Sequence, residues 1–64
     1  MSATDSLQSI IDSLTDALQD AEKFDRGTAA AGTRLRKAAQ EGKNALQDLR
    51  VSVQATKKAR QEGE

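Results

Sequence analysis

The chemically active side chains in this sequence are carboxylates, amines, guanidinium groups and hydroxyls. The chain contains no Cys and no His, so it offers no thiolate or imidazole to bind a metal ion and no imidazole to activate a nucleophile. We therefore expect no metal, no cofactor, no small-molecule substrate and no enzymatic activity. The remaining chemistry is electrostatic, and it depends on where the charges lie.

Ten basic and ten acidic residues cancel overall but are unevenly distributed along the chain. Residues 1–25 carry six acids and one base, a net charge of −5, whereas residues 26–64 carry nine bases and four acids, a net charge of +5. Four cations of the second half recur every seven residues, which on a helix places them ~10.5 Å apart along one flank. This basic ridge consists of Arg36, Lys43, Arg50 and Lys57.

Further cations surround the expected start of a second helix. Between Arg26 and Lys43 there are five basic residues and one acid, Glu41. The free N–H groups at the start of a helix favour an anion such as phosphate. The side chains predicted to contact the phosphates of double-stranded DNA are Arg26, Arg34, Arg36, Lys37, Lys43, Arg50 and Lys57.

Two interpretations of the basic ridge remain open. Cations beside a coiled-coil seam can simply shield the apolar core and set helix pairing, which would make the chain a helical oligomerisation or protein-interaction module with no nucleic-acid role. A linear cationic ridge can also follow a phosphate backbone. The sequence has one aromatic residue, Phe24, and it belongs to the apolar pattern, so duplex backbone contact is favoured over base stacking.

Two helices are needed to position these charges. A heptad pattern of apolar residues predicts a helix over residues 4–25, with Asp5, Asp12, Asp16 and Asp20 facing outward. Gly27 can adopt the left-handed conformation that ends a helix, which predicts a turn over 26–28. A second heptad pattern predicts a helix over 28–60, followed by a frayed tail over 61–64.

A short turn makes the two helices antiparallel neighbours, so residues 1–64 should form a single all-α helical hairpin with a short first helix and a longer second helix. In that register Phe24 lies near Gly32, and Leu14 lies level with Gly42. The apolar stripe of the first helix is broader than one partner helix can cover, which predicts a homo-oligomer, most simply a dimeric coiled-coil-like bundle. The predicted core and oligomer residues are Leu7, Ile10, Ile11, Leu14, Leu18, Phe24, Leu35, Leu46, Leu49 and Val53.

Apolar runs in the chain never exceed two large residues. This pattern fits neither a membrane span nor the apolar region of a secretory signal. We therefore expect no association with a membrane and a location in the cytoplasm.

One segment of the chain resembles a known family. The segment is Gly27-Thr28-Ala29-Ala30-Ala31-Gly32-Thr33-Arg34-Leu35-Arg36-Lys37-Ala38, followed by Gln40-Glu41 and by Leu46-Gln47-Asp48-Leu49-Arg50. It resembles the bacterial linker-histone-like family, which includes the chlamydial histone-like proteins, over roughly residues 22–52. Its most specific part is Ala31-Gly32-Thr33-Arg34-Leu35-Arg36-Lys37.

The resemblance implies a small helical nucleoid-associated protein that binds and compacts DNA. It assigns DNA contact to Arg34, Arg36 and Lys37, and also to Arg50. The sequence departs from the family pattern at Thr28 and Ala29, where the family often has Asn and Lys, and it has no Lys-rich tail like that of the chlamydial members.

Overall fold

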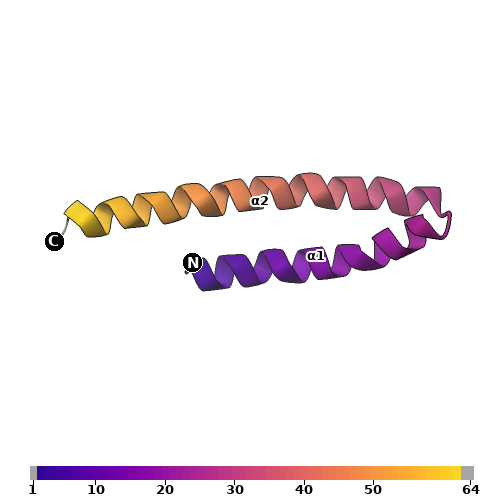
Figure 1. Ribbon diagram of the computed structural model, residues 1–64, viewed down its shortest axis with the longest axis horizontal. Coiled ribbons are helices and arrows are strands. Elements are labelled where there is room, and N and C mark those ends of the chain that lie inside the picture. The colour runs from indigo at the N-terminus through magenta and orange to yellow at the C-terminus, as the bar shows by residue number, and fades with distance from the viewer. Residues whose placement is uncertain (1, 63–64) are drawn as a thin grey trace.

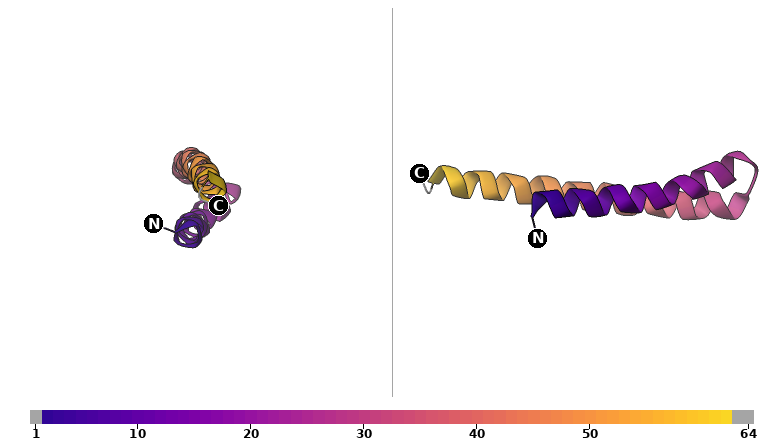
Figure 2. Two further views of the ribbon diagram at one scale, coloured as in Figure 1. Left: turned by 90° about the vertical axis from the view of Figure 1, so that its left-hand side faces the viewer. Right: turned by 90° about the horizontal axis from the view of Figure 1, so that it is seen from below.

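The structure, a computed structural model that describes residues 2–62, consists of two antiparallel helices, α1 (Ala3–Asp25) and α2 (Ala29–Glu62) (Figure 1). No strand occurs in the described part of the chain. The predicted all-α hairpin, with a short first helix and a longer second one, is confirmed. Two further views show one pair of rods with no second layer (Figure 2), and the molecule measures 55 × 15 × 14 Å.

The start of α1 is set by Ser2. Its backbone is extended, and its Oγ accepts a hydrogen bond of 3.0 Å from the backbone N–H of Asp5. This contact satisfies one of the N–H groups that a helix start leaves unpaired. The helix therefore begins at Ala3, one residue earlier than the heptad pattern indicated.

The turn between the helices is a Schellman motif. The backbone N–H of Thr28 donates to the carbonyl of Lys23 at 3.0 Å, and that of Gly27 donates to the carbonyl of Phe24 at 2.9 Å. Gly27 has φ +104°, a conformation that an L side chain rarely adopts. This residue ends α1 and turns the chain back on itself.

The second helix is longer than the heptad pattern predicted. It begins at Ala29, where the carbonyl of Thr28 accepts from the N–H of Ala31 at 3.2 Å, and it continues through Glu62. Gln61 and Glu62 therefore belong to α2 rather than to a frayed tail, and positions 63–64 lie outside the described residues. The last turns of α2 project past the start of α1 (Figure 1).

Large side chains of α1 pack against glycines of α2, in the predicted register. A Cβ atom on Gly32 would lie 2.5 Å from Cδ1 of Phe24, and one on Gly42 would lie 3.2 Å from Cδ2 of Leu14. The absence of a side chain at these two positions thus lets the helices approach closely.

Close approach leaves the hairpin with a small core. The buried hydrophobic residues are Ile10, Ala17 and Ala31. Of the ten residues predicted as core or oligomer contacts, only Ile10 is buried within the hairpin, and Leu35 and Leu49 are half-buried. The other seven stay exposed: Leu7, Ile11, Leu14, Leu18, Phe24, Leu46 and Val53.

These seven side chains stay exposed because two packed helices cover only one narrow part of each other's surface. Contact between copies by the exposed residues stays a prediction.

Within the described residues, neither helix is long and apolar enough to cross a membrane.

Candidate nucleic-acid interface

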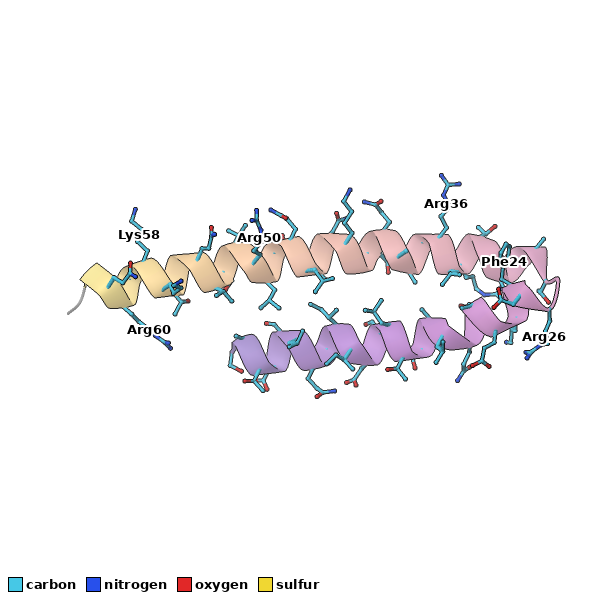
Figure 3. The ribbon with its side chains drawn as sticks, viewed as in Figure 1. Phe24, Arg26, Arg36, Arg50, Lys58 and Arg60 are labelled. Atoms are coloured by element: carbon cyan, nitrogen blue, oxygen red, sulfur yellow. The ribbon has the colours of Figure 1, made fainter. Side chains whose placement is uncertain are left out.

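The basic ridge lies on the part of α2 that α1 does not cover. All four of its residues are exposed. Figure 3 shows Arg36 extending from α2 on the side away from α1, and Arg50 also on that half of the helix. Because the four residues are seven apart, they form a line about 31 Å long.

One edge of the ridge borders an apolar surface. Lys43 and Arg50 line an open groove together with Leu14, Gly42 and Leu46. Arg36 lines a second hollow, nearer the turn, beside Phe24. Three of the four cations of the ridge therefore border exposed apolar side chains on one side of the hairpin.

Arg34 has a different environment from the ridge. Its Nε donates to Oδ1 of Asp20 at 2.9 Å, which joins α2 to α1 by an ion pair. The side chain of Asp20 is 23% exposed, so this carboxylate turns toward α2 rather than outward as expected. Arg34 itself remains 53% exposed. Among the side chains that the structure describes, this is the one ion pair.

The two acids of α2 closest to the ridge in sequence lie on the opposite edge of the hairpin. Glu41 lines a hollow with Ser9 and Ser13, and Asp48 lines another with Ser9. The exposed residue Lys37 follows Arg36 and so lies about 100° further around the helix, on the outward side. Because Glu41 and Asp48 lie on the opposite edge, neither acid interrupts the surface formed by the basic ridge.

Arg26 stands apart from the other predicted residues. It is the C-cap residue of α1, and its N–H donates to the carbonyl of Glu22 at 3.2 Å. Its exposed side chain extends from the turn end of the hairpin (Figure 3). It can reach a phosphate beyond the turn, but it is not part of the ridge.

Two exposed cations near the end of α2 were not among the predicted contacts. Lys58 extends on the side away from α1, as Arg36 does, whereas Arg60 extends on the opposite side (Figure 3). The sequence spacing could have predicted that Lys58 lies on the same side of the helix as Arg36, because it follows Arg36 by 22 residues, which is close to six helical turns. The predicted helix over residues 28–60 already contained this position.

This arrangement suits contact with a charged polymer. A line of cations about 31 Å long is comparable to one turn of B-DNA, about 34 Å. No group of three or more His, Cys, Asp or Glu residues in the described part of the chain could hold a metal ion. The single aromatic residue, Phe24, packs against Gly32 at the contact between the two helices, which favours contact with the duplex backbone over base stacking.

Comparison with known proteins agrees with the resemblance seen in the sequence. No curated protein and no solved structure matches the chain significantly. Residues 4–59 match the family model of histone H1-like protein Hc1, which extends the resemblance well beyond residues 22–52. That family consists of histone-like, DNA-binding nucleoid proteins and is not a family of enzymes. Because the match covers most of the sequence, the chain belongs to the histone H1-like Hc1 family.

Proposed function

We propose that this protein binds double-stranded DNA in the bacterial nucleoid by contacting phosphates without reading the base sequence, and so compacts or organises DNA. The observation that carries the proposal is the exposed basic ridge on the uncovered side of α2. The acids of α2 that fall between these cations in sequence, Glu41 and Asp48, lie on the opposite edge of the hairpin and so do not interrupt the ridge. Cations of this kind displace the counterions condensed on DNA when they bind. Family membership supports the same function.

The proposal assigns different weights to the predicted residues. The main contacts come from the outward half of α2, which carries the ridge together with Lys37 and Lys58. Arg34 contributes less than the ridge, because its Nε is already paired with Asp20 and its charge is partly neutralised by that carboxylate. Arg26 contributes at the turn end, where it meets a different stretch of backbone.

Titration of a random-sequence duplex at several salt concentrations tests the proposal. At about 50 mM salt, micromolar protein should shift the duplex, and log affinity should fall linearly with log salt. Replacing Arg36, Lys43 and Arg50 together by Gln should leave the helix content unchanged. It should also flatten the salt slope by about 0.9 for each phosphate that the variant no longer neutralises.

A matched control separates position from net charge. Lys43→Gln and Lys23→Gln remove the same side chain and the same charge, but Lys23 lies on α1 rather than on the ridge. Only the Lys43 variant should weaken DNA binding appreciably. Equally weakened binding by both variants would mean that the protein responds to overall charge and that the ridge is not the binding surface.

The eight exposed large apolar side chains of the described residues favour a second candidate function, a helical module for association with protein. Under that function the ridge would only flank a seam between helices. An absence of any DNA shift at about 50 mM salt would reject the first function and leave the second.

A further inference from the structure

One side of α1 carries four large apolar residues that the hairpin leaves uncovered. Leu7, Ile11, Leu14 and Leu18 are 45%, 47%, 42% and 57% exposed, and their spacings of four, three and four residues place them on one side of the helix. We call these four residues the α1 strip. Along one edge of the strip, the neighbouring residues around the helix are the uncharged Thr4, Gln8 and Thr15. Glu22 lies on the same edge, near the turn.

A second copy of the same chain fits this strip. The spacing of four, three and four reads the same in both directions, so an antiparallel copy can place Leu7 against the partner's Leu18 and Ile11 against the partner's Leu14. Such a two-fold contact uses the same surface on both copies. The acids Asp5, Asp12 and Asp16 lie away from this contact.

Packing α1 against α2 of a second copy is less favourable. On the corresponding side, α2 presents Arg36, Lys43 and Arg50, which border the groove and the hollow beside Leu14 and Phe24. Burying charged heads against apolar side chains costs free energy unless each charge finds a partner. Strip against strip buries only apolar and uncharged groups.

The expected contact is small. With 23 residues α1 is about 35 Å long, and a seam about 10 Å wide along it would bury roughly 350 Å² per copy. Stable interfaces usually bury about 800 Å² per partner. The chain alone should therefore form a weak dimer.

Pairing through the strip brings the two basic ridges face to face. The groove lined by Leu14 also contains Lys43 and Arg50, so strip and ridge lie on the same side of the hairpin. Leu14 lies level with Gly42, and the antiparallel copy then places Lys43 opposite the partner's Lys43. Repulsion between the ridges opposes the dimer, and a phosphate backbone between them would remove that repulsion.

We propose that two copies associate through the α1 strip in antiparallel orientation, and that their facing basic ridges line one groove that receives a DNA backbone. Self-association and DNA binding then strengthen each other, by an equal factor in both directions. The groove rests on the proposed DNA-binding function, whereas the contact between strips does not.

Sedimentation at several protein concentrations, without DNA, tests the contact first. Leu18→Gln should weaken the dimer at least tenfold, and Val51→Gln should leave it unchanged. The two residues are similarly exposed, 57% and 54%, but Val51 follows the half-buried Leu49 by two residues and so points away from α1 and from the α1 strip. A monomeric parent protein at millimolar concentration, or equal effects of both variants, would overturn the contact.

Disulfide formation between single-cysteine variants tests the orientation, since the chain has no cysteine of its own. In the antiparallel dimer, the two copies of position 11 are offset by about 5 Å along the helix, whereas those of position 7 are about 16 Å apart. Ile11→Cys should therefore form a disulfide-linked dimer readily, and Leu7→Cys should not. Efficient linkage of both variants would indicate a parallel dimer and refute the proposal.

The salt dependence and Lys43→Gln test the groove. Without DNA, raising salt from about 50 to about 300 mM should tighten the dimer, because it screens the repulsion between ridges. Lys43→Gln should likewise tighten the dimer several-fold while it weakens DNA binding. Addition of duplex DNA should tighten the dimer of the parent protein at least tenfold.

The possible failures have different meanings. Dimers that form and ignore DNA would refute the groove but leave the α1 strip as an interface. An intact dimer that binds no DNA at all would refute the proposed function, and with it the groove, but would leave the contact between strips standing. DNA binding by a strictly monomeric protein would refute this inference and leave the proposed function standing.

Discussion

Replacement of Gly32 and of Gly42 by Ala, one at a time, should change the stability of the hairpin in opposite directions. Both glycines lie inside α2, and neither has a positive φ. In a helix interior each substitution therefore gains about 1 kcal/mol from the higher helix propensity of Ala. What distinguishes the two positions is the atom that the new methyl group meets.

At Gly32 the new Cβ would lie 2.5 Å from Cδ1 and 2.6 Å from Cε1 of Phe24, distances that force the ring to move. Overpacking of this kind typically costs about 1–3 kcal/mol, so Gly32→Ala should destabilise the hairpin by about 1 kcal/mol in total. At Gly42 the Cβ would lie 3.2 Å from Cδ2 of Leu14, the end of a flexible and 42% exposed side chain. Gly42→Ala should therefore stabilise the hairpin by about 0.5–1 kcal/mol.

Thermal unfolding followed by circular dichroism measures this difference. The protein concentration must be the same for each variant, because association adds to the apparent stability. A change of about 1 kcal/mol shifts the Tm of a chain of this size by about 4–8 °C, so the two variants, whose stabilities differ by about 1.5–2 kcal/mol, should differ in Tm by about 6–16 °C. In a Phe24→Ala background the obstacle is gone, and Gly32→Ala should then be stabilising.

A Gly32→Ala variant as stable as the Gly42→Ala variant, both in the parent sequence, would contradict this expectation. It would mean that the ring of Phe24 does not lie over Gly32. The alignment of the helices near the turn would then be wrong.

Three further substitutions test the ends of the helices and their one ion pair within the described residues. Gly27→Ala should destabilise the hairpin by about 1–2 kcal/mol in urea unfolding, because φ is +104° there, and an unchanged midpoint would contradict the turn geometry. Ser2→Ala should cost about 1 kcal/mol and speed amide exchange at Asp5, whose N–H loses its partner, whereas unaltered exchange would argue against the cap. Asp20→Asn should change stability by less than about 1 kcal/mol, since the pair is partly exposed. It should also raise DNA affinity by freeing Arg34, and an unchanged affinity would exclude Arg34 from the phosphate contacts.

Much of the fold could be predicted because it depends on local rules. Heptad spacing predicts the helices, since a helix turns by a constant angle per residue. Gly27 predicts the turn, because few other residues adopt a left-handed backbone without strain. A short turn then determines the alignment, which is why Phe24 meets Gly32 and Leu14 meets Gly42. The end of α2 at Glu62 was harder to predict from the sequence, because the last residues of the helix follow no apolar pattern.

The candidate site could be predicted only in part. The ridge follows from a repeat of seven residues, and its exposure agrees with that pattern. The partner of Arg34 could not be foreseen, since Arg34 and Asp20 are 14 residues apart and meet only when the two helices pack. A helical wheel for one helix places Asp20 outward, because it contains no information on the rotation of that helix against its neighbour.

The sequence alone specifies which residues are helical, where the chain reverses and how the charges are spaced along each helix. Which part of each apolar stripe is covered depends on how the two helices pack in three dimensions. Ala17 and Ala31 are buried together with Ile10, whereas Leu14 and Leu18 stay exposed. The physical reason is that small residues let two helix backbones approach closely, so the contact centres on alanine and glycine and displaces the larger side chains to its edge.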